Sequence, residues 1–395
     1  MRAVPPEGHT ARDVLRAVRR AVDGPGPAVL LGGAPDDSGD ISVAASGAGS
    51  RDVEVPPGTA AVVVTSGSTG YPKSVVLGRN ALVASAFATR ARIGEGAWLL
   101  ALPPTYVAGL QVLVRSLMAG HEPAVVEGPF QPRAFAAAAR GMASSVGGHA
   151  IARYTSLVPA QLVRLIDAAD DADVRAAIAG FEAILVGGQM LPEPVRERAE
   201  SLGARIVRTY GSSETSGGCV YDAVPLDGVR VRIEHGEVQV SGPMLATEYL
   251  GDPERTEAVF VRDARGDRWY RTGDAGAFEG GRLRVTGRLD NVIVSGGVNV
   301  SLDRVERIAR ALPGLASAVV VGVPDERWGE ASVVVVPGEP SPEDAPLLER
   351  VREAVAAEIG SPARPARLLR LAELPELSSG KPDRRAIRAR VMSDR

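Results

Sequence analysis

Short apolar, β-forming runs alternate with helical patterns through most of the chain. The runs are "AVVV" at 61, "AWLLAL" at 97, "PAVVEG" at 123, "EAILV" at 182 and "RIVRTY" at 205. Helical patterns cover residues 79–91, 132–140 and 159–169. This alternation predicts β/α units around a largely parallel sheet. The loops that follow the strand ends are then the expected ligand-binding edge.

The pattern changes at about residue 229, where two hairpins with Gly-containing turns follow, "VRVRIEHGEVQV" and "AFEGGRLRVTG". They predict a small antiparallel β-subdomain. Beyond Asp290 come a helix from Ser301, strands at "ASAVVVGV" and "ASVVVVPG", and a helix through "LLERVREAVAAEI". We therefore expect an α/β fold with a large N-terminal domain, residues 1–289, and a small α+β C-terminal domain, residues 290–395.

Composition narrows the class of protein. With 395 residues and 45% hydrophobic content, the chain can bury a large core. The net charge of -3 lacks the basic excess of a nucleic-acid binder. One Cys and four scattered His predict neither a disulfide nor a zinc site. No segment has the pattern of a secretion signal or a membrane span. We expect a cytoplasmic protein that acts on a small molecule, without a nucleic-acid or membrane partner; a homo-oligomer stays open.

Lys is almost absent from the chain. It occurs only at Lys73 and Lys381, against 43 Arg among the 45 basic residues. A coding bias towards Arg explains why Lys is rare, but not why it remains at these two positions. Lys is a compact point charge on a flexible stem, which suits a crowded phosphate site better than the planar fork of Arg.

The first of these lysines ends the segment "TSGSTGYPK". Its loop residues are Thr65, Ser66, Gly67, Ser68, Thr69 and Gly70, followed by Lys73. Backbone N–H groups and hydroxyls with little side-chain bulk allow close approach to phosphate oxygens. The loop is not a Walker motif, because Pro72 stands where that motif needs Gly. An ordinary strand-to-helix turn is the competing interpretation.

Two further loops carry candidate chemistry. In "VRTYGSSETSGG", Tyr210 could stack on a base, Gly211 with Ser212 and Ser213 could approach phosphate, and Glu214 could hold Mg²⁺. In "WYRTGDAG", Asp274 could accept the two ribose hydroxyls. Taken singly, each is equally natural as a polar turn.

Five segments in this order resemble the adenylate-forming superfamily of acyl-CoA synthetases, adenylation domains and luciferases. They are "TSGSTGYPK", "YGSSE", "TGD", "GRLDNVI" and the "GK" at 380, spanning residues 60 to 387. The resemblance implies an enzyme with two half-reactions. A carboxylate first attacks the α-phosphate of Mg-ATP to give an acyl adenylate, and the thiol of coenzyme A then displaces AMP.

The resemblance also implies roles for individual residues. Lys381 would bridge the carboxylate and the α-phosphate, Lys73 would hold the outer phosphates, and Glu214 would hold Mg²⁺. Asp290 would be the hinge about which a mobile C-terminal domain rotates between the two steps. Further implied contacts are Gly187, Gly188, Gln189 and Arg288 on the ATP side, and Gly296 and Gly297 on the coenzyme A side.

Three segments resemble one branch of the superfamily, the o-succinylbenzoate-CoA ligases of menaquinone biosynthesis. They are "LPPTYVAGLQVLVRSLMAG", "TSLVPAQLVRL" and "ILVGGQMLP". Such a substrate has a second carboxylate, whose burial needs a cationic partner. Arg115 and Arg153 are candidates, and a structural role is an equal alternative for each. Tyr106 stands where the superfamily often has a His in the acyl pocket.

Other functions stay open from the residues alone. Another acyl- or aryl-CoA ligase, or a standalone amino-acid adenylation enzyme, would carry the same nucleotide loops. An amino-acid activator needs an acidic residue for the substrate amine, and the sequence does not identify one. A nucleotide-binding regulator without turnover would not need Lys381.

Overall fold

The computed structural model describes most of the chain. The described residues are 1–6, 10–24, 26–31, 53–66, 72–143, 145–377 and 381–394. Of the predicted phosphate-loop residues, Gly67, Ser68, Thr69 and Gly70 lie outside the described residues, and so does the side chain of Ser66.

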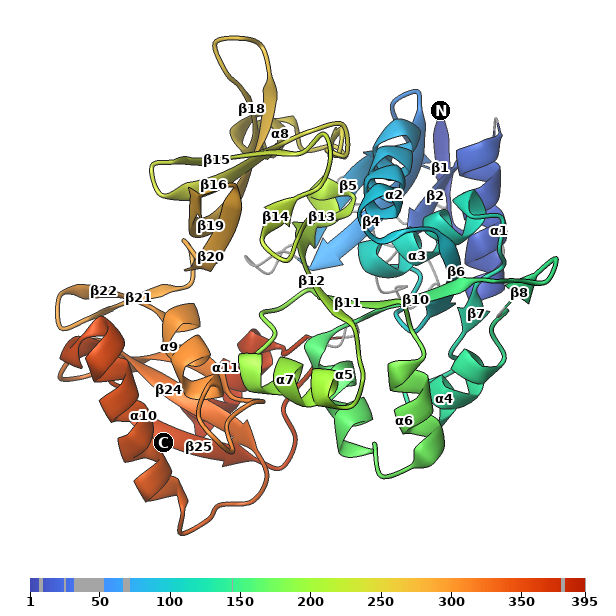
Figure 1. Ribbon diagram of the computed structural model, residues 1–395. Helices are drawn as coiled ribbons and strands as arrows, with labels where there is room; N and C mark the ends of the chain where they lie inside the picture. The colour runs from blue at the N-terminus through green and yellow to red at the C-terminus, as the bar shows by residue number, and fades with distance from the viewer. Residues whose placement is uncertain are drawn as a thin grey trace.

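A six-stranded sheet near the N-terminus carries the hairpin that flanks the predicted phosphate loop (Figure 1). Its order is β17-β5-β4-β2-β1-β3. The strands are β1 (Arg2–Val4), β2 (Ala28–Leu31), β3 (Val53–Glu54), β4 (Thr59–Ser66), β5 (Pro72–Gly78) and β17 (Glu248–Tyr249). β4 and β5 pair antiparallel, with Thr65 opposite Lys73. The predicted loop therefore joins two strands of one hairpin, and Lys73 belongs to β5.

The second sheet confirms the predicted parallel arrangement. Its order is β14-β13-β12-β11-β10-β6-β7. The strands are β6 (Gly96–Leu100), β7 (Ala124–Val125), β10 (Ala152–Leu157), β11 (Ala183–Gly187), β12 (Ile206–Ser212), β13 (Gly217–Tyr221) and β14 (Val224–Pro225). All pairs from β7 to β12 are parallel, whereas β13 and β14 add antiparallel. The carboxyl ends of β10, β11 and β12 consequently share one edge.

Helices cover both faces of this second sheet. α1 (Ala11–Asp23), α2 (Arg79–Ile93) and α3 (Val107–Met118) share one buried apolar cluster with strands of both sheets. α4 (Pro132–Arg140), α5 (Pro159–Asp167), α6 (Ala172–Ala179) and α7 (Glu193–Ser201) form a second cluster on the opposite face. α4 and α5 each begin at a Pro, where the missing N–H is not needed for the helix.

The two predicted hairpins form a separate β-subdomain. Its sheet contains β15 (Arg230–Glu234), β16 (Glu237–Ser241), β18 (Phe260–Arg262), β19 (Arg268–Glu279) and β20 (Arg282–Arg288). The short helix α8 (Pro253–Val259) precedes β18, and the small hairpin of β8 (Ser145–Val146) and β9 (His149–Ala150) lies apart. β20 ends at Arg288, which pairs with Asp274 of β19.

The C-terminal region has a sheet of its own, in the order β22-β21-β24-β23 with β25 beside β24. Its elements are β21 (Val292–Ser295), β22 (Val298–Ser301), α9 (Leu302–Arg310), β23 (Val319–Asp325), β24 (Gly329–Pro337), α10 (Asp344–Ile359), β25 (Arg367–Leu371) and α11 (Arg384–Ser393). The short 3₁₀ turns η1 (Ser213–Thr215) and η2 (Ser361–Ala363) complete the chain. Two buried apolar clusters in this region contain only residues from Ile293 onward.

A buried ionic network ties α11 to α9. Arg384 donates to Glu306 at 2.9 Å, and Arg310 pairs with the same carboxylate at 2.9 Å. Removing one partner from a buried carboxylate strongly destabilises a fold. The pairing of Arg384 with Glu306 therefore holds α11 in place. Lys381 lies three residues before α11 and is positioned by it. Among the described helices, none is long and apolar enough to cross a membrane.

Candidate active site

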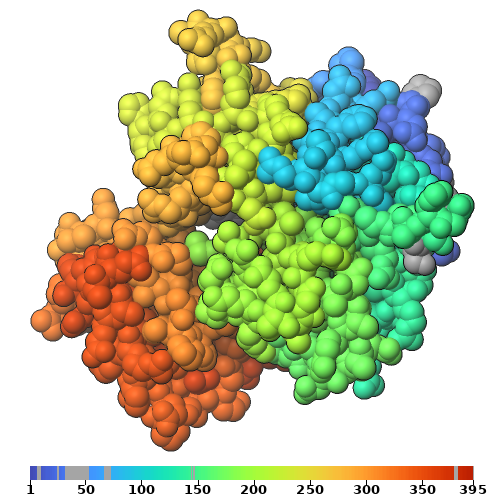
Figure 2. Space-filling view, in the orientation of Figure 1, coloured from blue at the N-terminus to red at the C-terminus, as the bar shows by residue number. Residues whose placement is uncertain are grey.

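The C-terminal region meets the second sheet at the shared strand edge. Figure 2 shows a hollow where the orange C-terminal residues meet the green and yellow-green surface. Lys381 reaches Gly188, just after β11: a Cβ built on Gly188 would lie 3.2 Å from the Lys381 Cε. Nearby, Arg164 of α5 faces Glu376 at 3.8 Å. Residues of the two regions therefore lie side by side around this edge.

Glu214 is the buried negative charge of the site, with 2% of its side chain exposed. It lies in η1, directly after β12. Its Oε1 accepts hydrogen bonds from the Lys73 ammonium and, at 2.8 Å, from the Tyr249 hydroxyl. Lys73 and Tyr249 come from paired strands of the first sheet, so this contact joins the first sheet to the second.

The surroundings of Glu214 keep it ionised. Burial alone would raise its pKa, but the charge of Lys73 and the hydrogen bonds from Lys73 and Tyr249 outweigh burial and lower the pKa. Mg²⁺ in nucleotide sites is commonly held by one or two carboxylates together with substrate phosphates. An ionised lone carboxylate beside the phosphate-loop lysine fits a Mg²⁺ ion that arrives with ATP. No cluster of three or more His, Cys, Asp or Glu in the described ranges suggests a separate metal site.

A second cluster surrounds Asp274. The Tyr210 hydroxyl donates to Asp274 Oδ2 at 2.6 Å, and Arg288 Nη1 lies 3.2 Å from Oδ1. Burial raises the pKa of Asp274, although Tyr210 and Arg288 act in the opposite direction. The pKa of Tyr210 is raised well above its ordinary value by burial and by the nearby Asp274 charge. Tyr210 is thus a neutral hydroxyl donor, and Asp274 keeps lone pairs for further donors such as a ribose.

Arg288 connects this cluster to the end of the β-subdomain. Its guanidinium pairs with both oxygens of Asp290 at 3.0 Å and donates to the Thr272 carbonyl at 2.7 Å. The hydrogen bonds to Asp290 raise the pKa of Arg288 further above its ordinary value. The predicted hinge residue, Asp290, and the predicted ribose acceptor, Asp274, therefore both pair with Arg288.

Lys381 contributes a second positive charge near Glu214. Its side chain keeps contact with solvent, yet the protein packed around the ammonium removes enough hydration to lower its pKa. Attraction from Glu214 acts in the opposite direction and raises the pKa. Lys73 thus contacts Glu214 directly, whereas Lys381 lies against Gly188 at the same edge of the second sheet.

Several predicted glycines have close protein neighbours. A Cβ on Gly211 would clash with the carbonyl oxygen of Gly217, and one on Gly187 would clash with Thr209. Neighbouring strands therefore explain why these two positions need Gly. Gly188 is different, because its φ of +82° and its contact with Lys381 place it in the site.

The remaining ATP-side predictions lie around the same edge. The Thr65 hydroxyl donates to the Lys73 carbonyl at 3.4 Å, and Ser212 N–H donates to the Thr215 hydroxyl at 2.8 Å. Ser213 begins η1. Gln189 follows Gly188 in the bend after β11. Their proposed contacts with ATP stay predictions.

The two candidate arginines occupy different surroundings. Arg153 donates to the Ala139 carbonyl at 3.3 Å and the Gly180 carbonyl at 2.9 Å, which ties α4 to α6. Arg115 has 6% exposure, donates to the Tyr221 hydroxyl at 3.3 Å and stacks on Trp98. Burial lowers the pKa of Arg115, and its Nε has no hydrogen-bond partner in the part of the chain that the structure describes. Arg115 lies in a small cavity of about 20 Å³ with Gly94 and Gly96, where β6 begins, and so at the other end of the strands from Gly188.

The coenzyme A candidates are not brought to this edge. Gly296 and Gly297 form the turn between β21 and β22, with φ of +58° and +81°. Figure 1 shows this hairpin at the outer left of the molecule, away from β11 and β12. Val292, Ile293 and Val294 on one strand and Val298 and Val300 on the other favour extended backbone, and the two glycines form the turn of the hairpin.

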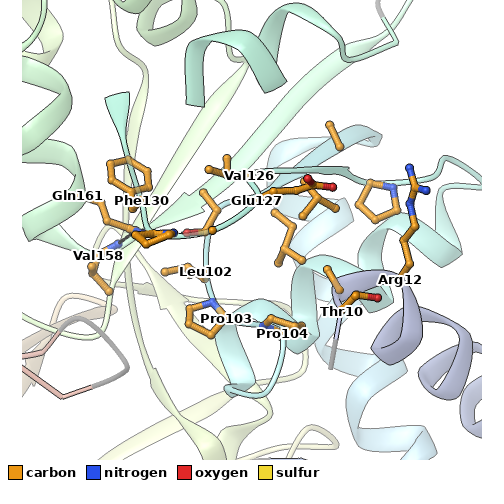
Figure 3. A pocket seen from close by; sticks show the side chains of 18 of the residues that line it. Thr10, Arg12, Leu102, Pro103, Pro104, Val126, Glu127, Phe130, Val158 and Gln161 are labelled. Atoms are coloured by element: carbon orange, nitrogen blue, oxygen red, sulfur yellow. Dashed lines mark hydrogen bonds between the residues drawn. The ribbon is translucent and has the colours of Figure 1, made fainter. Parts of the chain in front are cut away.

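A cavity of about 900 Å³ lies beside the site. Figure 3 shows Leu102, Pro103, Val126, Phe130 and Gln161 around it, with Thr10 and Arg12 of the N-terminal region at the far side. The predicted acyl segments "LPPTY" and "VPAQL" supply much of its wall. Tyr106 follows these wall residues as the N-cap of α3.

Sequence reasoning missed two residues of the site. Tyr249 contacts Glu214 from β17, thirty-five positions along the chain. Asp303 of α9 accepts the backbone N–H of Arg288 at 2.7 Å. Neither residue lies in a glycine-rich or strongly polar loop, so no local signal distinguished it.

Comparison with known proteins shows close similarity to ligases. The chain is 38% identical over 392 residues to the "Probable 2-succinylbenzoate--CoA ligase" of Mycobacterium tuberculosis (strain CDC 1551 / Oshkosh), covering 97% of this chain and 96% of that protein. A structure of an E. coli MenE variant with bound OSB-AMS matches at TM-score 0.69 and 26% identity, over 93% of this chain and 77% of that chain. The amide bond synthetase McbA from Marinactinospora thermotolerans matches at TM-score 0.69 and 28% identity, over 92% and 75%.

Two family patterns match the chain. The AMP-binding enzyme pattern covers residues 20–250, and the AMP-binding enzyme C-terminal domain covers residues 304–381. These ranges include Lys73, Glu214 and Lys381, the three charges that converge at the strand edge. The chain belongs to the AMP-binding enzyme family.

Proposed function

We propose that this protein is a 2-succinylbenzoate-CoA ligase that uses Mg-ATP and forms AMP. The main supporting observation is that Lys73 contacts Glu214 and Lys381 lies against Gly188 at one edge of the second sheet. The chain is also similar along nearly its whole length to a relative named for that activity. A cytoplasmic location and a homo-oligomeric state stay predictions.

In the first half-reaction, a carboxylate oxygen of the substrate forms a bond to the α-phosphorus of ATP. The bond from that phosphorus to the bridging oxygen breaks, and pyrophosphate leaves with the electron pair. Negative charge on the oxygens around the α-phosphorus must be met by fixed cations. Lys381 supplies one from the C-terminal region, while Lys73 holds the outer phosphates. Tyr210, Asp274 and Gly188 line the nucleoside side.

Glu214 would hold the Mg²⁺ ion, which neutralises phosphate charge when bound. For this role the carboxylate must stay ionised before the nucleotide arrives. Lys73 and Tyr249 keep it so. Once phosphates and Mg²⁺ are present, Lys73 can turn to the phosphates while Tyr249 keeps its hold on Glu214.

In the second half-reaction, the thiolate of coenzyme A bonds to the acyl carbon and AMP leaves. We propose a domain boundary between residues 289 and 290, because β20 closes one sheet at Arg288 and β21 opens another at Val292. Rotation about Asp290 would withdraw Lys381 and bring Gly296 and Gly297 to the acyl adenylate. The outward position of their hairpin supports the need for such a movement.

Arg115 would recognise the second carboxylate. A buried guanidinium without an ionic partner is costly, and a carboxylate ligand would relieve that cost. The described residues supply Arg115 with a hydroxyl and an aromatic face but no carboxylate within 4 Å. Arg115 lies near the start of β6 and does not line the 900 Å³ cavity, so for this role the packing between them would have to open.

The likeness to McbA supports one alternative. An amide bond synthetase would make the same acyl adenylate and pass it to an amine in place of a thiol. The site charges described above serve adenylation in both cases, so the acceptor must be tested separately from the acid.

The proposed substrate makes the first prediction. With ATP and Mg²⁺, o-succinylbenzoate should support pyrophosphate exchange far better than benzoate, fatty acids or amino acids. With coenzyme A it should yield the thioester, and an amine panel at equal concentration should yield little amide. Faster exchange with any other acid, or amide as the main product, would contradict the proposal.

Arg115→Gln should raise the KM for o-succinylbenzoate by about 10- to 100-fold, since a hydrogen-bonded charge pair is lost. The KM for ATP should not change, nor should activity with benzoylpropionate, which lacks the second carboxylate. Arg153→Gln is the matched control and should lower thermal stability while leaving the KM for o-succinylbenzoate unchanged. An unchanged KM in Arg115→Gln would place the carboxylate partner elsewhere.

Lys381→Ala should slow acyl-adenylate formation by about 10²- to 10³-fold, as for loss of one contact to developing charge. Thioester formation from supplied acyl adenylate should persist, because no phosphate is attacked in that step. Lys73→Ala should mainly raise the KM for ATP. Normal pyrophosphate exchange in Lys381→Ala would refute the role of that lysine.

Tyr249→Phe should destabilise the fold in a pH-dependent way. The pKa of Glu214 is lowered in the folded state, so its ionisation adds stability above its ordinary pKa of 4.5, and this stability is lost as pH falls through the lower folded value. Removing the Tyr249 hydroxyl should cost about 1–3 kcal/mol at neutral pH. Urea unfolding should show this difference shrinking below about pH 4. A difference independent of pH would mean that lost packing, not Glu214, is responsible.

A further inference from the structure

Asp303 bonds to both sides of the proposed hinge. Its Oδ2 accepts the backbone N–H of Arg288 at 2.7 Å, and its Oδ1 accepts a hydrogen bond from the Asn291 side chain at 2.7 Å. Arg288 precedes Asp290 and ends β20, whereas Asn291 follows it and leads into β21. The Asp303 carboxylate thus accepts hydrogen bonds from the residues on both sides of Leu289 and Asp290, the segment about which rotation is proposed.

The packing around this carboxylate is close. A Cβ built on Gly287 would lie 2.8 Å from the Asp303 Cβ and 3.0 Å from the Ser301 hydroxyl oxygen. Leu289 N–H donates to the Gly273 carbonyl at 2.8 Å, which holds the same segment from the side of β19. The start of α9 therefore rests directly on the end of β20 in the orientation that carries Lys381 to Gly188.

We propose that Asp303 is a positioning residue that latches the C-terminal domain in the adenylate-forming orientation. This rests on the proposed function, because it assumes rotation about Asp290 between the half-reactions. Such a rotation carries Asp303 away from Arg288, so their hydrogen bond must break. Asn291 lies on the same side of the hinge as Asp303, and their hydrogen bond travels with the domain.

An acidic residue in the first turn of a helix has a simpler explanation. Asp303 lies there in α9, where a negative charge is favourable near the helix N-terminus. However, the N-cap residue of α9 is Ser301, whose hydroxyl accepts a hydrogen bond from the Arg304 N–H at 3.4 Å. Both Asp303 oxygens accept hydrogen bonds from the hinge segment, and Oδ1 also lies 3.7 Å from Arg384 Nη2 of α11. A role confined to α9 does not require these contacts.

The test uses Asp303→Asn in the full chain, with Asn291→Ala as the matched control. Asp303→Asn keeps the shape but replaces one acceptor oxygen by an NH₂ group and removes the charge that faces Arg288 N–H, the Asn291 amide and Arg384. We expect pyrophosphate exchange with o-succinylbenzoate to fall by about three- to tenfold, the effect of losing one hydrogen bond of ordinary strength. Thioester formation from supplied acyl adenylate should be as fast as in the unaltered protein or faster. Asn291→Ala should leave the ratio of the two rates unchanged.

Hydrogen exchange gives a readout that needs no turnover. The Arg288 amide is the donor to Asp303, so a peptide spanning residues 286–291 should exchange faster in Asp303→Asn and not in Asn291→Ala. A peptide from β23 should exchange equally in all three proteins, which shows that the C-terminal core remains folded.

The possible outcomes distinguish failure of the proposed role of Asp303 from failure of the proposed substrate. Equal loss of both half-reactions, or the same rate ratio as in the unaltered protein, would overturn the latch, as would unchanged exchange at residues 286–291. A change in Asn291→Ala as large as in Asp303→Asn would assign the effect to local loop packing and also overturn it. If the unaltered protein shows no pyrophosphate exchange with o-succinylbenzoate, the substrate proposal fails by itself, and the same assays with an acid it does activate, together with hydrogen exchange, still decide the latch.

Discussion

The buried charge of Glu214 is the constraint on which the rest of the site depends. A carboxylate with 2% exposure must be met by cations and hydroxyl donors, because the free energy of leaving it unpaired is several kcal/mol. The partners come from the first sheet, with Lys73 on β5 and Tyr249 on β17, while Glu214 follows the second sheet. The same interaction therefore joins two sheets and gathers positive charge where phosphates are expected.

The second constraint is that the site is assembled from two regions. Lys381 belongs to the C-terminal region and is held before α11 by the Glu306 network, yet it lies against Gly188 of the second sheet. Its place in the site thus depends on the orientation of the C-terminal region. A few hydrogen bonds at the hinge, each worth only about 1 kcal/mol, are strong enough to bias that orientation and weak enough to be broken in each catalytic cycle.

Local pattern predicted most elements of the fold, because hydrophobic periodicity and Pro or Gly boundaries act over a few residues. The helix at 132–140 and the parallel strands at 97, 182 and 205 are confirmed. Tyr249 and Asp303 could not be found this way, since their partners are set by tertiary packing. The hydrogen-bond partners of Arg115 and Arg153 could not be predicted either. Arg115 donates to the Tyr221 hydroxyl and Arg153 to the Gly180 carbonyl, and both partners are distant in sequence.

The central claim is that the substrate carboxylate attacks the α-phosphate of ATP while Lys381 is in place. The most direct measurement uses o-succinylbenzoate whose carboxylates carry a heavy oxygen isotope, together with ATP, Mg²⁺ and coenzyme A. The account predicts that mass spectrometry finds one heavy oxygen in the AMP released, because the carboxylate oxygen stays on the phosphorus when the thiol displaces AMP. Unlabelled AMP, or label in inorganic phosphate with ADP as the product, would contradict it.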